Sequence, residues 1–253
     1  MAKWEETEDV EGDRKTFVPL ENNPEVFTAL LHKLGVAPTL GFYDILSLDD
    51  QDLLAFIPRP CFAVLATIPA EAYAAARAVD SAVDMPIYDG SGASEPVIWF
   101  RQTIGHACGT IGALHAVSNG GAKAFITPDS DLDKLLKAAV PLKPKDRASL
   151  LYNSAELEAA HSTAAQMGDS VAPLPSEENY NHFIAFVRGD DGHLWELEGG
   201  VDGPIDRGVL GEADDALSEK ALQLGIRPFL EKATSAANET INFSVVALAP
   251  ALD

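Results

Sequence analysis

The sequence predicts an α/β fold, and three stretches of the chain carry this prediction. Residues 23–36 have the pattern of an amphipathic helix, with Asn23 suited to the N-cap, Pro24 to the first helical position and apolar residues repeated along one face. Residues 61–67 (CFAVLAT) form a short run between prolines that is typical of a buried strand. Residues 181–200 contain two alternating apolar runs joined by RGDDG, which is the pattern of a β-hairpin.

The other elements follow between and after these three. We expect, in chain order, an Ala-rich helix from about Ala70, an irregular loop at 85–96, a helix from Cys108 to a terminator at 119–121, two or three helices in 130–167 with a break at 141–146, a helix at 216–232 and a last strand at 241–249. The polar stretch from His161 to Asn181 is too long for an ordinary connection, so it is expected to be a lid or a disordered segment.

Composition limits the class of protein. With 253 residues, of which 47% are apolar, the chain can bury a full core, and one domain is expected. Its best candidate for a membrane span, residues 55–70, is interrupted by Arg59 and by prolines, so a soluble protein is expected. The charged N-terminus lacks the features of a signal peptide, and two cysteines cannot build a disulfide framework or a zinc site. A reducing setting, cytoplasmic or also nuclear, fits best.

The chain is strongly acidic, with a formal net charge of −21 from 18 basic and 39 acidic residues. Such a charge repels phosphate backbones and anionic membranes, so nucleic acid and membrane surfaces are not expected as partners. It favours a basic partner. The alternative is that the acidity serves only to keep the protein soluble.

Cys108 is the first candidate for chemistry, because it begins a helix within RQTIGHACGTIGALHA (residues 101–116). Free N–H groups and the positive end of the helix dipole favour a thiolate there, so its pKa is expected to fall below the ~8.5 of a free cysteine. Cys108 is therefore a candidate nucleophile, with a buried structural cysteine as the alternative. Cys61, inside the expected strand 61–67, is interpreted as a core thiol.

A cysteine nucleophile needs a base, and geometry separates the six histidines. His106 is only two residues from the cysteine and would point away from it, and His115 lies roughly 10 Å along the same helix. His32 is expected to be solvated, and His161 has no evident partner to orient it. The histidines of the hairpin remain.

The register of the hairpin distinguishes its two histidines. If the hairpin is centred on Asp190, His182 faces Glu198 across the strands, whereas His193 points to the opposite face of the sheet. A carboxylate beside a histidine fixes the tautomer and stabilises the imidazolium of a nucleophilic triad. The alternative is an ordinary cross-strand pair without a catalytic role.

Five motifs, spread over nearly the whole chain, resemble one known family. They are PLENNPEVF, PRPCFAVL, QTIGHACGTIG, HFIAFV and GHLWELEGG, in this order. The chain is similar to the ubiquitin C-terminal hydrolases, thiol peptidases of the papain-like superfamily. This resemblance implies an α/β/α sandwich with a central, mainly antiparallel sheet, a knotted backbone and a crossover loop over the active site, here residues 161–181. Residues 1–15 would then be a flexible acidic N-terminus and 16–253 a single catalytic domain.

The resemblance also implies roles for four residues. Cys108 matches the nucleophile, His182 the base, Glu198 the third triad position and Gln102 the glutamine of the oxyanion hole. The implied activity is the hydrolysis of amide, ester or thioester bonds at the C-terminal glycine of ubiquitin, with no cofactor or metal. Small or unfolded leaving groups are favoured, because the crossover loop limits what can pass.

The same resemblance points to a partner and to two binding residues. Ubiquitin carries arginines ahead of its final glycines, and Glu21 and Asp44 match positions that receive them. A monomer is expected.

Two departures from the family pattern stand out. His106 replaces a common asparagine, and Glu198 replaces the usual aspartate; an otherwise working triad is expected. The alternative functions are a catalytically weak ubiquitin-binding protein and a thiol peptidase for a related modifier.

Overall fold

One six-stranded sheet forms the centre of the computed structural model, which describes residues 15–80, 86–168, 181–237 and 243–251. The strands are β1 (Leu40–Asp44), β2 (Ala63–Pro69), β3 (Asn181–Arg188), β4 (His193–Leu197), β5 (Ile205–Val209) and β6 (Ser244–Pro250). The helices are α1 (Pro24–Leu34), α2 (Gln51–Leu54), α3 (Ala70–Ala78), α4 (Cys108–Val117), the 3₁₀ helix η2 (Gly120–Phe125), α5 (Asp131–Ala139), α6 (Pro144–Tyr152), α7 (Ala155–Ala165), α8 (Glu219–Leu224) and α9 (Ile226–Ala237).

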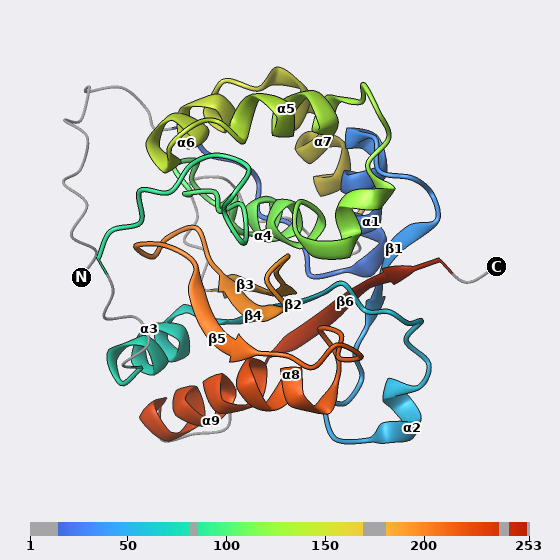
Figure 1. Ribbon diagram of the computed structural model, residues 1–253, viewed down its shortest axis with the longest axis vertical. Coiled ribbons are helices and arrows are strands. Elements are labelled where there is room, and N and C mark those ends of the chain that lie inside the picture. Colours follow the sequence, from blue (N-terminus) through green and yellow to red (C-terminus); the bar gives the residue numbers. More distant parts are fainter. Residues whose placement is uncertain (1–14, 81–85, 169–180, 238–242, 252–253) are drawn as a thin grey trace.

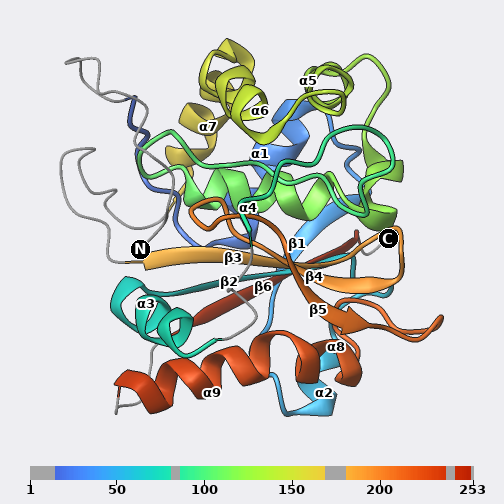
Figure 2. The same ribbon diagram turned by 60° about the vertical axis from the view of Figure 1, so that its left-hand side comes forward.

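Helices cover both faces of this sheet (Figures 1 and 2). The strand order is β1-β6-β2-β3-β4-β5, and every neighbouring pair is antiparallel. One core lies between the sheet and the layer of α1, α4 and α7, and a second core lies between the sheet and α3, α8 and α9. The expected α/β/α sandwich with a mainly antiparallel sheet is confirmed. None of the helices in the described ranges has both the length and the apolar character to cross a bilayer.

The first helix forms for the predicted reasons. The side chain of Asn23 accepts a hydrogen bond from the backbone N–H of Glu25 at 2.8 Å, and Pro24 occupies the first turn. The helix ends at Gly35, whose φ of 100° is in the left-handed region that favours glycine. All five apolar residues expected on its inner face are buried in the core on the α4 side of the sheet (Val26, Phe27, Leu30, Leu31 and Leu34).

Several boundaries differ from the prediction. The helix expected at 216–232 is divided into α8 and α9 at Gly225, where an added Cβ would lie 2.9 Å from side chains of the sheet. His161 lies inside α7 and not in the polar loop, so the expected extent 161–181 of the crossover loop is wrong at its start. Residues 169–180 of that loop and residues 1–14 of the acidic N-terminus lie outside the described residues.

The hairpin has a different centre from the predicted one. Ala185 pairs with Leu197, so the ladder continued by one residue places Glu198 across from Ile184 and not from His182. The cause is a three-residue turn that ends at Gly192, with a left-handed φ of 79°. The difference is an even number of residues, so His182 and Glu198 still lie on the same face of the sheet.

A buried cation fixes the loop that leads toward Cys108. Arg147 of α6 is 0% exposed and forms an ion pair with Glu95, together with a second hydrogen bond to the same carboxylate at 3.1 Å. Its guanidinium also donates to the carbonyls of Ala139 and Val140 at 3.0 and 3.1 Å. The loop around Glu95 is thus anchored to the turn between α5 and α6.

Replacing Arg147 with Met should lower the free energy of unfolding by about 3–5 kcal/mol, because it leaves the Glu95 carboxylate buried and unpaired. Urea denaturation of both proteins measures this difference. The control is Lys143→Met, which removes an exposed ion pair with Asp89 and should cost no more than about 1 kcal/mol. Equal losses in the two variants would contradict the role assigned to Arg147.

Candidate active site

Cys108 is the first residue of α4, a helix whose ten residues are all buried. The side chain of Ala107, at the N-cap, makes no capping hydrogen bond, so the first turn keeps N–H groups without intrahelical partners. The sulfur forms hydrogen bonds with the backbone of Gly109 and of Phe183, the residue after His182 in β3. Cys108 therefore lies against the beginning of β3.

The protonation of Cys108 differs from the prediction. Burial, followed by the negative charge of Glu198, raises the pKa of the thiol to about 11, and the backbone hydrogen bonds offset only part of this increase. The expected lowering of its pKa by the helix terminus is therefore wrong for this state of the protein. At neutral pH the resting nucleophile is a thiol.

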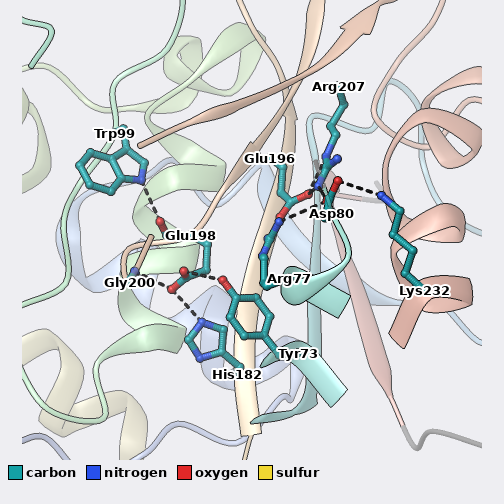
Figure 3. A network of polar contacts seen from close by, with 10 residues as sticks. All are labelled: Tyr73, Arg77, Asp80, Trp99, His182, Glu196, Glu198, Gly200, Arg207 and Lys232. Atoms are coloured by element: carbon teal, nitrogen blue, oxygen red, sulfur yellow. Dashed lines mark hydrogen bonds and ion pairs between the residues drawn. The ribbon is translucent and has the colours of Figure 1, made fainter. Parts of the chain in front are cut away.

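His182 and Glu198 are in contact, as Figure 3 shows. The imidazole Nε2 lies 2.7 Å from Oε1 of Glu198, and their side chains are 23% and 1% exposed. The predicted contact is thus present, although it is reached diagonally across the hairpin. Because Nε2 faces the carboxylate, Nε2 carries the proton and Nδ1 is the nitrogen left to accept one.

Glu198 is held as a carboxylate despite its burial. Burial opposes its ionisation, but the charge of His182 at close contact and hydrogen bonds from Tyr73 and Gly200 prevail and lower its pKa to about 2. The hydroxyl of Tyr73 donates to Oε2 at 2.7 Å, and the backbone N–H of Gly200 donates to Oε1 at 2.6 Å. A carboxylate fixed in this way can hold an imidazole in one orientation.

Gln102 precedes α4 in the chain and lies at the end of a segment that runs alongside this helix. The amide of Asn119, just after α4, exchanges two hydrogen bonds with the backbone of Ile98, and Nε2 of His115 accepts from the N–H of Phe100 at 2.9 Å. The chain therefore runs along α4 towards its N-terminus. At Gln102 the backbone N–H donates to the carbonyl of Gly199 at 2.8 Å.

This arrangement connects Gln102, the candidate oxyanion donor, to the backbone beside Glu198, the candidate third member of the triad. Gly199 follows Glu198 directly, and an added Cβ at Gly199 would lie 2.9 Å from the backbone nitrogen of Gln102. The indole of Trp99 donates to the carbonyl of Glu198 at 2.8 Å. The side-chain amide of Gln102 donates to the carbonyl of Ile104 at 3.1 Å, and an amide has a second N–H for another acceptor.

The other histidines have structural surroundings. His106 has a left-handed φ of 55°, a conformation in which His and Asn are both enriched, so the departure from asparagine is compatible with the backbone there. His32 was expected to be solvated, but it is half-buried and its Nε2 lies 2.8 Å from the carbonyl of Leu40. His193 forms an ion pair with Asp206 and lies on the face opposite to His182, as predicted.

His161 and His115 are buried residues that hold α4 in place. His161 was expected to lack a partner; instead its Nδ1 lies 2.6 Å from the hydroxyl of Thr110, and its Nε2 lies 2.8 Å from the carbonyl of Val18. Burial lowers the pKa of His161 to about 4 and that of His115 to about 3, so both are neutral. Neither is placed to act as the base for Cys108.

Glu21 and Asp44 lie at the ends of two elements on the β1 side of the sheet. Glu21 precedes α1, and its carboxylate is beside Gly168, where the described chain stops before residue 181. Asp44 is exposed and ends β1, where it pairs with Val246 of β6. Both stay candidates for contact with a basic segment.

Reasoning from the sequence missed four residues that shape this site. Tyr73 and Trp99 donate hydrogen bonds to Glu198. His115 and Asn119 bond to the backbone of the segment that leads to Gln102. The polar character of the last two within an apolar helix region was the available signal. No three His, Cys, Asp or Glu side chains gather to hold a metal ion in the part of the chain that the structure describes.

Comparison with known proteins gives consistent matches. Residues 17–231 match the sequence model described as "Ubiquitin carboxyl-terminal hydrolase, family 1". Ubiquitin carboxyl-terminal hydrolase 3 of Arabidopsis thaliana is 34% identical over 237 residues, covering 92% of this chain and 94% of that protein. Ubiquitin carboxyl-terminal hydrolase isozyme L1 of Rattus norvegicus is 34% identical over 233 residues, covering 92% and 98%.

A solved structure has the same fold. The Trichinella spiralis UCH37 catalytic domain, crystallised with ubiquitin vinyl methyl ester, superposes with a TM-score of 0.71 at 18% identity, covering 96% of this chain and 97% of that one. With a family match across most of the sequence and a cysteine at the start of the buried helix, the chain belongs to ubiquitin carboxyl-terminal hydrolase family 1, a family of cysteine peptidases.

Proposed function

We propose that this chain hydrolyses bonds at the C-terminal glycine of ubiquitin, with Cys108 as nucleophile, His182 as base, Glu198 as its orienting carboxylate and Gln102 as an oxyanion donor. Membership of the family supports the reaction. The observation that carries the assignment of residues is the contact between His182 and the buried, ionised Glu198. The next residue after His182, Phe183, contacts the sulfur of Cys108 through its backbone.

The proposed reaction begins with proton transfer. The Cys108 sulfur attacks the carbonyl carbon of the terminal glycine while its proton passes to Nδ1 of His182. The resulting imidazolium is stabilised by Glu198, which already faces Nε2. The negative oxygen of the tetrahedral intermediate accepts hydrogen bonds from the Gln102 side-chain amide and the Cys108 backbone N–H.

The second half regenerates the enzyme. The intermediate collapses when the bond to the leaving amine breaks, and His182 gives its proton to that amine, which leaves a thioester on Cys108. Water then attacks the thioester carbonyl while His182 accepts a proton from it. The ubiquitin carboxylate is released, and the proton returns to the sulfur. No cofactor takes part in these steps.

The resting thiol gives this mechanism a particular order. Because the pKa of Cys108 is about 11 in the free enzyme, the proton leaves the sulfur during the attack and not before it. We expect bound substrate to take part in activating the thiol. It would displace water from the sulfur and align Nδ1 of His182 with the thiol proton. This order protects a buried nucleophile from reagents that require a thiolate.

The substrate tail supplies the remaining specificity in this proposal. Glu21 and Asp44 would receive the basic residues ahead of the final glycines, which agrees with the acidic excess of the whole chain. The crossover loop that the resemblance implies would limit the size of the leaving group, so small adducts and unfolded extensions are the proposed substrates.

Cys108→Ala should abolish hydrolysis of a ubiquitin C-terminal amide and capture of ubiquitin bearing a C-terminal electrophile, because the nucleophile is lost. Binding of unmodified ubiquitin should persist, which titration calorimetry measures. The control is Cys61→Ala, which removes the other, fully buried thiol and should keep both activities. Capture that persists in Cys108→Ala and disappears in Cys61→Ala would assign the wrong cysteine.

Alkylation of the free enzyme by iodoacetamide should become about ten times faster per pH unit between pH 6 and 9, since the thiolate fraction rises in that way below a pKa of about 11. The reaction is followed by mass spectrometry in a Cys61→Ala background, so that only Cys108 is counted. A rate that is already constant above pH 7 would show a preformed thiolate and contradict the proposed order of steps.

Glu21→Gln and Asp44→Asn should each raise KM for a ubiquitin amide by up to about five-fold, because partly exposed ion pairs contribute about 0.2–1 kcal/mol. The value of kcat should stay constant, since neither residue touches the reacting bond. Steady-state kinetics at low salt measures both constants. The control is Glu231→Gln, which removes an exposed carboxylate on α9 in the other helical layer. An equal rise in KM in this variant would show that the net charge of the protein, and not the position of Glu21 or Asp44, causes the effect.

A further inference from the structure

Tyr73 contacts both His182 and Glu198. It belongs to α3, in the helical layer opposite to α4, and Figure 3 shows its side chain directed at Glu198 and His182. Its hydroxyl donates to Oε2 of Glu198 at 2.7 Å. Its ring lies against the imidazole of His182, with a centroid distance of 4.1 Å and an angle of 35° between the planes.

The hydrogen bond from Tyr73 completes the coordination of a buried carboxylate. His182 and the N–H of Gly200 both face Oε1 of Glu198, and in the described residues Tyr73 is the partner of Oε2. The torsion that rotates a carboxylate about its last bond has a broad minimum, so contacts to one oxygen alone leave the group free to turn. A donor on the second oxygen removes this freedom.

Tyr73 is itself held by a buried ionic cluster. Arg77, one turn further along α3, lies with its guanidinium carbon 4.9 Å from the Tyr73 ring centre and 5.1 Å from that of Phe229 in α9. Arg77 pairs with Glu196 of β4 and with Asp80, whose side chains are 0% and 3% exposed.

Further cations join this cluster from two other elements. Arg207 of β5 bonds to Glu196 and Asp80 at 2.7 Å each, and Lys232 of α9 bonds to Asp80 at 2.8 Å. The cluster thus connects α3, β4, β5 and α9, and it fixes the helix from which Tyr73 reaches the active site.

The hydroxyl remains a donor at neutral pH. Burial, together with the adjacent Glu198 charge, raises the pKa of Tyr73 well above its ordinary value, so the proton stays on the phenol. Because ionised Glu198 can only accept, the direction of this hydrogen bond is fixed.

We propose that Tyr73 is a positioning residue for hydrolysis: it locks the Glu198 carboxylate and packs against His182, so that Nδ1 of the imidazole is directed at the thiol. Tyr73 touches neither the substrate nor the sulfur in this role. The inference rests on the proposed function, since it assigns Tyr73 to the same triad.

The test compares Tyr73→Phe with the parent enzyme on a ubiquitin C-terminal amide. The substitution removes one hydroxyl and keeps the ring, so kcat should fall about ten-fold through the loss of a hydrogen bond to a charged group, while KM stays the same. The matched control is Tyr88→Phe, which removes an equivalent hydrogen bond from a tyrosine to Glu95, at 2.6 Å, away from the triad. That variant should keep the parent kcat. Thermal unfolding confirms that each protein is folded at the assay temperature.

A double-mutant cycle shows whether Tyr73 acts through Glu198. In a Glu198→Ala background, Tyr73→Phe should cause no further loss of single-turnover rate, because the group it positions is absent. A ten-fold loss in both backgrounds, or a kcat equal to that of the parent in Tyr73→Phe, would overturn the role of Tyr73. A parent enzyme that fails to hydrolyse the amide would instead overturn the proposed function.

Discussion

The site depends on a single buried charge. Glu198 is 2% exposed yet ionised, and such a group is tolerated only when its oxygens are paired and hydrogen-bonded. Meeting that requirement draws in His182 from β3, Tyr73 from α3 and the N–H of Gly200. The backbone around Glu198 has a second use, because its carbonyl and that of the next residue fix Trp99 and the segment that carries Gln102. The carboxylate thus organises the base and the oxyanion candidate together.

Much of the fold was predictable because local and tertiary preferences agree. The first helix carries its cap, its proline and its apolar face in one short stretch, and each of these has the predicted place in the structure. The buried strand, the Ala-rich helix and the hairpin followed from equally simple patterns. The strands β1 and β5 did not, since each has only five residues and lies at an edge of the sheet; β1 pairs with β6 near the other end of the chain, and β5 pairs with β4 through an irregular register. Pairing of this kind leaves little trace in a local pattern.

The candidate site was predictable in its residues more than in its electrostatics. The parity of the hairpin brought His182 and Glu198 to one face even though the centre of the turn lies one residue further along the chain than assumed, because the pairing is displaced by an even number of residues and this preserves the face. The thiol of Cys108 was assigned the wrong direction of pKa shift, since its helix start could be read from the sequence but its burial and the nearby charge of Glu198 could not. Tyr73 escaped notice for the same reason: nothing in an Ala-rich helix indicates which tyrosine meets a carboxylate 125 residues away.

The two neutral histidines that hold α4 make the folded protein sensitive to acid. His115 and His161 have pKa values of about 3 and 4 in the fold, whereas in an unfolded chain both would take up a proton near the ordinary value of 6.5. Unfolding therefore binds protons as the pH falls below about 6.5, and the stability that these residues provide at neutral pH is lost progressively down to about pH 3. His115 belongs to the helix that begins with the nucleophile, and His161 bonds to Thr110 of the same helix, so acid weakens the packing around the segment that carries Cys108. Neutral histidines are therefore a condition for the stability of the helix that carries the nucleophile.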